Sequence, residues 1–442
     1  MKRILMAAIP MLAASAWGDF PVEVKVAHPE RYACGEVASF EATLRDPKTQ
    51  ASPTNGIVTA VLSNYGTEVV ASNDFDMAVS PTVRIEGALA KPGCLLLTLT
   101  GKPVRRNWGG GSFVYSVAYE PERIETGIAK PGDFDAYWDG EIARLEREVP
   151  LDPRLEPCEK YSSEKRDLYR VSFATFNGRR VWGFLSLPKN AGGRTFPTRV
   201  NVPGAGPGQC AFNAEGDDRE VVLHLNVHYF EPSFEKGGNG KAMVAEAKEC
   251  AAKFGGPGGN YALTGYASTR EGYFYHDAIV GLVRAVNWLY ERPEVDRTRF
   301  TYAGTSQGGG FGLILGGLTG RFTRLVAYVP ALADHFAYRN HRRAGWPRFI
   351  DLRPGAADLA RAEAIMPYYD TAFFASRITC PVRFIVGLSD SVCPPATGTA
   401  AYNACPSKDK ALEMVPGMPH AVFKPIYAKY DDWLRNGDAA EK

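Results

Sequence analysis

The sequence predicts an α/β protein in which a β-sandwich precedes a doubly wound, mostly parallel sheet, and three observations support this. Residues 21–119 contain short stretches of alternating apolar and polar residues without a long helical pattern. After about residue 130, strand-like and helical patterns alternate. Within that second part, residues 300–310 have the pattern of a strand, a tight turn and a helix. Regular short strands are typical of a sandwich, and alternating strands and helices are typical of a doubly wound sheet.

Length and composition describe an ordinary globular protein that is long for a single core. The chain has 442 residues, of which 45% are hydrophobic and 23% are charged, so we expect two domains. The predicted divisions are an export signal at 1–18, an Ig-like β-sandwich domain at 19–122 and an α/β domain at 123–442. The net charge of +2 gives no electrostatic reason to expect nucleic acid as a partner.

The first residues have the three parts of a secretory signal. Lys2 and Arg3 supply positive charge, residues 4–14 form an apolar run, and Ala14-Ser15-Ala16 has the small-residue pattern of a cleavage site. The apolar run is too short to cross a bilayer, so we expect no membrane insertion. A buried N-terminal helix is the alternative. The pattern predicts an exported protein, either periplasmic or secreted.

In the first domain the alternating stretches are expected to be strands, with Pro, Asn, Asp and Gly turns between them. These strands are expected at residues 22–26, 39–44, 82–85, 95–100 and 114–118. The stretch at 95–100 is more continuously apolar than the others. No residue in this domain has the pattern of a catalytic group.

The second domain is expected to open with a helix from residue 133 to 145, with Asp133 as its N-cap. Further helices are expected at 241–253, 276–290 and 371–378. Apolar, β-branched strands are expected at 168–173, 181–187, 198–202, 221–227, 325–329, 381–387 and 411–415. Such strands suit a sheet that is buried on both faces.

The eight cysteines do not predict a metal site. They are Cys34, Cys94, Cys158, Cys210, Cys250, Cys380, Cys393 and Cys405. No two have the CxxC spacing of a zinc site, so we expect no bound metal. In an exported protein Cys34 and Cys94 are a candidate disulfide, and free buried thiols are the alternative.

The segment Gly304-Thr305-Ser306-Gln307-Gly308 has the Gly-x-Ser-x-Gly pattern of a nucleophile elbow. A serine at the tip of a tight strand-to-helix turn needs unusual backbone angles, and the residues two before and two after it must be small. Such a turn would expose the Ser306 hydroxyl and aim the backbone N–H of Gln307 at the group under attack. The alternative is a glycine-rich helix entry that Ser306 caps.

A serine nucleophile needs a base and an orienting carboxylate. In α/β-hydrolases the three residues follow one another along the chain in the order Ser, Asp or Glu, His. Of the histidines after Ser306, only His420 sits late enough, in a loop after the predicted strand at 411–415. Asp390 ends an apolar strand, which is where open α/β sheets place functional groups. Asp334 also follows a strand and is the competing acid.

Two motifs are specific in combination: Ser306-Gln307-Gly308-Gly309 and the run 387–395, Gly-Leu-Ser-Asp-Ser-Val-Cys-Pro-Pro. With Asp133-Phe134-Asp135-Ala136-Tyr137-Trp138, they resemble carbohydrate esterase family seven, the acetyl xylan esterases and cephalosporin C deacetylases. The resemblance covers about residues 130–435. It implies an α/β-hydrolase fold with Ser306 as nucleophile, Asp390 as orienting acid and His420 as base, and it favours Asp390 over Asp334.

The resemblance also implies a substrate and an assembly. The expected substrate is an acetylated xylan, xylo-oligosaccharide or small acetyl ester, and homo-oligomers are expected. The mechanism calls for no metal or organic cofactor. The remaining alternatives are a serine peptidase of the same fold and a non-catalytic carbohydrate-binding protein, and the complete Ser, Asp and His set counts against the latter.

An oxyanion hole requires two N–H donors. Gln307 supplies the first, and Ala205, in the glycine-rich loop after the strand at 198–202, is expected to supply the second. The family typically has His-Gly-Tyr where this chain has Pro203-Gly204-Ala205. A backbone donor survives that change, but a contact from the tyrosine ring is lost. A plain Gly-Pro turn is the alternative for this loop.

Two further departures from the family pattern bear on the acyl-group and sugar preference. Asn226-Val227-His228-Tyr229 stands where the family usually has Asp-x-Arg-Gly. Pro419-His420-Ala421 stands where it commonly has Gly-His-Glu. Neither change alters the expected reaction.

Overall fold

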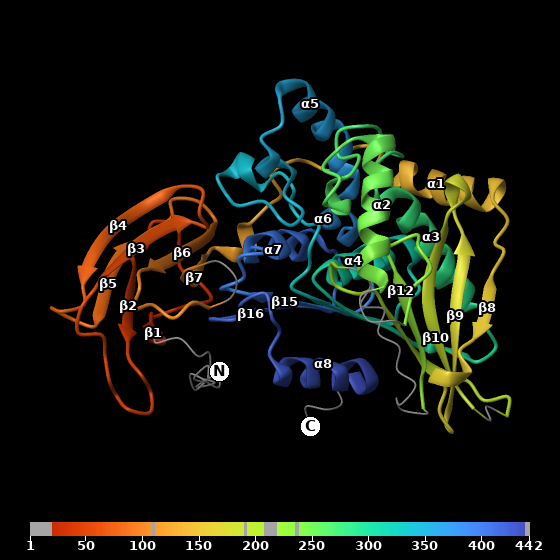
Figure 1. The fold of residues 1–442 in the computed structure, drawn as a ribbon, viewed down its shortest axis with the longest axis horizontal. Helices are drawn as coiled ribbons and strands as arrows, with labels where there is room; N and C mark the ends of the chain where they lie inside the picture. The colour runs from red at the N-terminus through yellow and green to blue at the C-terminus, as the bar shows by residue number, and fades with distance from the viewer. Residues whose placement is uncertain (1–19, 108–110, 190–191, 207–218, 235–237, 438–442) are drawn as a thin grey trace.

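The computed structural model describes residues 20–107, 111–189, 192–206, 219–234 and 238–437. The predicted export signal at 1–18 lies outside the described residues, as does Cys210. Figure 1 shows the first strands, β1 to β7, gathered at one end of the molecule and strands β8 to β10 at the other. A large sheet with helices on both sides lies between these ends.

Two antiparallel sheets form the N-terminal part and are called the N-terminal sheets below. One contains β1 (Val22–Lys25), β2 (Ala38–Leu44) and β5 (Thr82–Gly87), in that order. The other has the order β4 (Val69–Asp76), β3 (Ile57–Asn64), β6 (Gly93–Thr100), β7 (Phe113–Tyr119). A shared core that includes Phe40, Leu62 and Leu97 lies between them. The predicted β-sandwich is therefore confirmed, because apolar residues of both sheets meet on their inner faces.

The position of strand β6 between two apolar clusters explains why its sequence is continuously apolar. Leu95, Leu97 and Leu99 belong to the core between the two sheets. Cys94 and Leu96 point to the other face, where they belong to a cluster with Leu388, Ala396 and Ala400 of the α/β part. The strand is thus buried on both faces, since the second sheet packs against the rest of the protein.

Over the residues that the structure describes, the large sheet has nine strands, and the predicted doubly wound architecture is confirmed. Strands β11 to β16 are parallel to their neighbours, except that β12 pairs antiparallel with β10, and β8 to β10 are antiparallel. The order is β16 (Lys410–Val415), β15 (Val382–Gly387), β14 (Arg324–Tyr328), β13 (Val295–Thr305), β11 (Phe196–Asn201), β12 (Val221–Asn226), β10 (Arg180–Pro188), β9 (Arg166–Ala174), β8 (Arg154–Pro157).

Helices cover both faces of this sheet. They are α1 (Phe134–Glu148), α2 (Gly238–Phe254), α3 (Tyr275–Tyr290), α4 (Gln307–Thr319), α5 (Ala356–Ile365), α6 (Thr371–Ala375), α7 (Pro395–Ala404) and α8 (Lys424–Asn436). In Figure 1, α7 and α8 lie on opposite sides of β15 and β16. Successive side chains of β15 follow this arrangement: Phe384 packs with Tyr402 of α7, and Ile385 lies in the cluster with α8. Among the helices of the described ranges, none has the length and hydropathy to cross a membrane.

The structure corrects one expectation from the sequence, decides another and contains elements that were not predicted. Asp133 precedes α1 but does not cap it, because its carboxylate accepts from Arg270 at 3.2 Å and from the hydroxyl of Tyr368. Cys34 and Cys94 are free thiols and not a disulfide. Helices α5, α7 and α8 and strands β3, β4 and β8 were not predicted from the sequence pattern.

Candidate active site

Ser306 lies at the junction of β13 and α4 in an unusual backbone conformation. Its φ of 62° and ψ of −121° are seldom adopted by a residue with a side chain, and such a conformation costs about 1–3 kcal/mol. Three backbone hydrogen bonds stabilise it. The Ser306 N–H donates to Tyr328 O at 2.9 Å, and the Ser306 carbonyl accepts from the N–H groups of Gly310 and Ala331, each at 3.0 Å. The predicted strained turn is therefore present in the structure.

The glycines on either side of Ser306 are required by close backbone approach. A Cβ atom on Gly304 would lie 2.4 Å from the carbonyl oxygen of Gly308. A Cβ atom on Gly308 would lie 2.0 Å from the carbonyl oxygen of Val202. Both distances are shorter than any non-bonded contact allows, so a larger residue at either position would displace the backbone. This agrees with the reason given from the sequence for small residues two before and two after the serine.

The structure brings Ser306, His420 and Asp390 together. His420 Nε2 lies 2.9 Å from Ser306 Oγ, and His420 Nδ1 lies 2.8 Å from Asp390 Oδ2. The other carboxylate oxygen, Asp390 Oδ1, accepts from the N–H groups of Val392 and Cys393, both at 2.9 Å. Asp390 is fully buried, whereas the His420 side chain is 13% exposed. The carboxylate is thus fixed, and the imidazole lies between it and the hydroxyl.

The topology of the sheet explains why these side chains meet. Ser306 directly follows β13, Asp390 lies three residues after β15, and His420 lies five residues after β16. These strands are parallel and share one sheet with β14 between β13 and β15. Their carboxyl ends therefore meet at the same edge, where loops carry the functional groups of open α/β sheets.

Asp334, the competing acid, has other partners. Its Oδ2 pairs with Arg342 at 2.9 Å, and its Oδ1 accepts from the N–H of Gly127 at 2.7 Å. Burial raises the pKa of Asp334 to about 6 although the charge of Arg342 opposes this. No hydrogen bond joins it to His420, whose Nδ1 lies against Asp390. Asp334 therefore attaches the linker after the N-terminal sheets to the α/β part.

Gln307 begins α4 and is completely buried. Its side-chain Oε1 accepts from the hydroxyls of Tyr261 at 2.8 Å and Tyr275 at 2.6 Å, and its Nε2 donates to Pro203 O at 3.3 Å. These bonds fix the start of the helix and join it to the loop after β11. The first N–H groups of a helix have no intrahelical acceptor, and the Gln307 N–H is the first of α4.

Ala205, the predicted second donor, lies in the loop after β11. A Cβ atom on Gly204 would lie 3.9 Å from Ser306 Cβ and 3.6 Å from the Thr305 carbonyl oxygen. The loop therefore passes directly beside the serine. Ala205 itself is exposed, and the following Gly206 has a φ of 139° that suits glycine.

A buried pair not predicted from the sequence supports this loop. His228 Nδ1 contacts the Glu246 carboxylate, and His228 Nε2 donates to the Gly206 carbonyl at 3.2 Å. Glu246 also accepts from the Tyr229 N–H at 2.6 Å. His228 was noted in the sequence only as a departure from the family pattern. Glu246 lies on α2 and had no signal of its own, because only the fold brings α2 against the end of β12.

The buried Cys393 thiol near Asp390 is unreactive. Burial, reinforced by the charge of Asp390, raises the pKa of the Cys393 thiol well above its usual range, so this thiol stays protonated and is a poor nucleophile. Within the ranges that the structure describes, no group of three His, Cys, Asp or Glu side chains could hold a metal ion.

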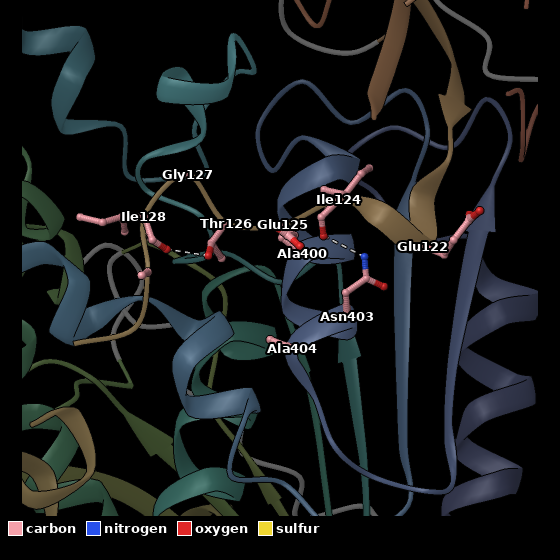
Figure 2. Close-up of a pocket in the computed structure, with 10 residues that line it drawn as sticks. Glu122, Ile124, Glu125, Thr126, Gly127, Ile128, Ala400, Asn403 and Ala404 are labelled. Atoms are coloured by element: carbon pink, nitrogen blue, oxygen red, sulfur yellow. Dashed lines mark hydrogen bonds between the residues drawn. The ribbon is translucent and has the colours of Figure 1, made fainter. Parts of the chain in front are cut away.

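A separate cavity of about 540 Å³ lies along the linker between the N-terminal sheets and α1 (Figure 2). It is lined by Glu122, Ile124, Glu125, Thr126, Gly127, Ile128, Ala129, Ala400, Asn403 and Ala404. Asn403 of α7 donates to the carbonyls of Pro121 and Ile124, each at 2.8 Å. None of the lining residues is Ser306, Asp390 or His420, so this cavity is distinct from the site above.

Comparison with known proteins places most of this chain in one family. The family model described as "Acetyl xylan esterase (AXE1)" matches residues 121–436. "Acetyl esterase Axe7A" of Xylanibacter ruminicola is 30% identical over 334 residues, which cover 74% of this chain and 70% of that protein.

The solved structures with a similar fold include two acetyl xylan esterases. They are acetyl xylan esterase 1 from Thermoanaerobacterium sp. JW/SL YS485, at 21% identity, and an acetyl xylan esterase from Paenibacillus sp. R4, at 20%. Both have a TM-score of 0.59, and each match covers 72% of this chain and 98% of the other. The chain belongs to the acetyl xylan esterase family and is a carboxylic ester hydrolase with the α/β-hydrolase fold.

Proposed function

We propose that this chain is an exported serine esterase that removes acetyl groups from acetylated xylan, xylo-oligosaccharides and related small acetyl esters. The observation that carries the proposal is the continuous set of hydrogen bonds from Asp390 through His420 to Ser306. The family membership supports acetyl esters as the substrate class. The pattern of the first eighteen residues supports export to the periplasm or the medium.

In the first half of the reaction, His420 Nε2 takes the proton of the Ser306 hydroxyl as Oγ attacks the acetyl carbonyl carbon. Asp390 keeps the imidazole in the tautomer with its proton on Nδ1 and stabilises the imidazolium. The N–H groups of Gln307 and Ala205 bind the negative oxygen of the tetrahedral intermediate. The loss of one such donor typically costs about 2.7–4 kcal/mol.

The tetrahedral intermediate then collapses and the bond to the sugar oxygen breaks. That oxygen takes the proton from His420 Nε2 and leaves as the alcohol, so that Ser306 carries the acetyl group. In the second half of the reaction, a water molecule gives a proton to His420 and attacks the carbonyl carbon of the acetyl-serine. Acetate leaves and the proton returns to Ser306 Oγ, which restores the enzyme.

The direct test is acetate release by the Ser306→Ala variant from acetylated xylan and from p-nitrophenyl acetate. We expect kcat/KM to fall by at least about 10⁴-fold, because the nucleophile is lost while the fold is kept. Ser407→Ala is the matched control, since the Ser407 hydroxyl donates to Cys380 O at 2.7 Å. Both residues precede strands β16 and β15, so they lie at the amino ends of the strands, away from the carboxyl ends where Ser306 lies. Wild-type-like hydrolysis by Ser306→Ala would refute the assignment.

Parallel assays separate the proposal from its rivals. Acetate release from a panel of acetylated oligosaccharides and longer acyl esters defines the acyl and sugar preference. Cleavage of Xaa-Pro peptides in place of acetyl esters would instead support a serine peptidase. Failure to react with a fluorophosphonate would support a non-catalytic carbohydrate-binding protein. Light scattering of the purified protein tests the homo-oligomer that the resemblance implies.

A further inference from the structure

The turn between β3 and β4 carries a tyrosine that reaches the proposed catalytic acid. Tyr65 is 2% exposed and has a φ of 51°, a conformation that tyrosine seldom adopts. Its hydroxyl donates to the backbone carbonyl of Asp390 at 2.5 Å, and the carbonyl of Leu388 lies 3.3 Å away. Burial, followed by the charge of Asp390, raises the pKa of Tyr65 well above its ordinary value. The phenol therefore remains a hydrogen-bond donor.

A second side chain of the N-terminal sheets contacts the same segment. Ser116 of β7 donates its hydroxyl proton to the Leu388 carbonyl. Tyr65 and Leu96 pack in one apolar cluster with Leu388 and Ala396, which excludes water from these hydrogen bonds. Buried hydrogen bonds are costly to leave unmade, so the contact fixes the backbone of the segment that carries Asp390.

The loop that carries the proposed base is contacted from the same side. Gly417 lies three residues before His420, and a Cβ atom on it would lie 3.6 Å from Tyr115 Cε2. The acid and base loops also contact each other, because the Ser389 N–H donates to Met418 O at 3.0 Å. The N-terminal sheets therefore pack against both loops that must be aligned.

This contact is additional to the fold that the family shares. The two solved esterases match 98% of their own length but only 72% of this chain. The family match begins at residue 121, directly after β7. The N-terminal sheets thus lie outside the matched region, although they touch the segment that carries the acid.

We propose that Tyr65 is a positioning residue, through which the N-terminal sheets keep the segment 388–390 where Asp390 Oδ2 faces His420. The inference rests on the function proposed above and assigns a role to the N-terminal sheets in that reaction. The side chain and the carbonyl of Asp390 are attached to the same backbone. A rotation that releases the carbonyl from Tyr65 would therefore also move the carboxylate away from the imidazole.

The test compares Tyr65→Phe with Tyr119→Phe in the full chain. The hydroxyl of Tyr119 also donates to backbone carbonyls, those of Glu36 at 2.8 Å, just before β2, and of Gly87 at 3.2 Å, in β5, so neither acceptor belongs to the α/β part. Each variant loses one buried phenol hydroxyl and keeps the ring. We expect Tyr65→Phe to lower kcat for p-nitrophenyl acetate about tenfold with KM unchanged, because a small displacement of an aligned group is costly. Tyr119→Phe should keep kcat.

A spectroscopic readout distinguishes positioning from stability. We expect the proton between His420 Nδ1 and Asp390 Oδ2 to give a downfield ¹H NMR signal, which is assigned by its loss in His420→Ala because His228 and His276 also bond carboxylates. Its position should change in Tyr65→Phe and not in Tyr119→Phe, with both proteins measured well below their melting temperatures. An unchanged signal together with wild-type kcat in Tyr65→Phe would overturn the inference.

Two further outcomes are informative. Equal losses of kcat in Tyr65→Phe and Tyr119→Phe, in parallel with equal losses of melting temperature, would also overturn the inference, because they indicate a purely structural role. In both cases the proposed function stands if Ser306→Ala is inactive. Retained activity in Ser306→Ala would instead refute the proposed function, whatever Tyr65→Phe does.

Discussion

Two histidines of this protein contact carboxylates in different ways, and the difference lies in the second ring nitrogen. His420 Nδ1 bonds Asp390, and its Nε2 faces the Ser306 hydroxyl. His276, in α3, bonds Asp277 through Nδ1 at 2.9 Å and Glu141 through Nε2 at 2.8 Å. A hydroxyl can give a proton to a histidine, whereas a carboxylate keeps the ring protonated.

The surroundings of the two histidines agree with this comparison. The His276 side chain is 1% exposed, and that of His420 is 13% exposed. Burial alone would lower the pKa of His276, but its hydrogen bonds to Asp277 and Glu141 raise it above the usual value. The two carboxylates therefore favour the protonated form of His276, which joins α1 and α3. The group that faces the second ring nitrogen decides whether a histidine–carboxylate pair is suited to proton transfer or to stability.

The largest expected effect comes from Asp390→Asn. An amide in place of the carboxylate favours the wrong imidazole tautomer, and we expect kcat for acetyl ester hydrolysis to fall about 10⁴-fold. Asp334→Asn is the matched control, because that carboxylate pairs with Arg342 and not with His420. We expect its kcat to stay within about twofold of wild type when measured well below its melting temperature. Equal losses in the two variants would contradict the role proposed for Asp390.

The same comparison predicts that His276→Ala lowers the stability of the protein and leaves its activity unchanged. Removal of the imidazole leaves Asp277, which is 3% exposed, with less of its compensating charge. Breaking a buried pair in this way typically costs about 3–5 kcal/mol of the free energy of unfolding. Denaturant titration should show that loss while kcat is retained. Exposed His28→Ala is the control and should change neither quantity.

A smaller effect on activity is expected from His228→Ala. This histidine contacts the Gly206 carbonyl, and its loss would loosen the loop that contains Ala205, the proposed second oxyanion donor. We expect kcat to fall about tenfold with little change in KM, which is less than the complete loss of an oxyanion donor. Steady-state kinetics on p-nitrophenyl acetate measure both constants. A rise in KM alone would instead assign His228 to substrate binding.

A smaller effect still is the pH dependence of stability at His276. Its pKa in the folded protein lies above the ordinary value of 6.5, so the folded state binds this proton more tightly than the unfolded chain. The contribution is complete below pH 6.5 and declines as the pH rises through the folded-state value. We expect the stability difference between wild type and His276→Gln to shrink from about pH 5 to pH 9.

The contribution of Glu141 to stability has the opposite pH dependence, because it is lost in acid. Burial favours its neutral form, but hydrogen bonds from His276 and Arg144 lower its pKa from 4.5 to about 2. Its contribution is therefore present above pH 4.5 and is lost as the pH falls through about 2. Thermal melts of wild type and Glu141→Gln across this range measure it. A constant difference between the two proteins would contradict the assigned pair.

The elements that the sequence predicted well are those with strong local patterns. Strands β1, β2, β5 and β7 of the sandwich alternate, the buried strands of the large sheet are rich in branched residues, and α3 has an apolar face. Strands β3 and β4 of the sandwich were not predicted. Helix α8 was missed although Ile426, Tyr430, Trp433 and Leu434 have helical spacing and are buried. Helix α7 had no such signal, because its small residues are buried on most sides and show no period.

The sequence by itself determined the elbow around Ser306, because the need for Gly304 and Gly308 arises within a few residues of local backbone geometry. It also left two acids open, Asp390 and Asp334, since both follow strands and only a family resemblance separated them. Partners that the fold brings to each carboxylate distinguish them in the structure: Arg342 and Gly127 engage Asp334, and His420 engages Asp390.

Only the tertiary structure decided the surroundings of the site. Asp133 has the residue type of a helix cap, but Tyr368 and Arg270 compete for its carboxylate. Tyr65 sits 325 residues before the carbonyl that it contacts, and nothing in its local sequence indicates that partner. Local propensity acts through neighbours in the chain, whereas a buried hydrogen bond depends on which elements the fold packs together.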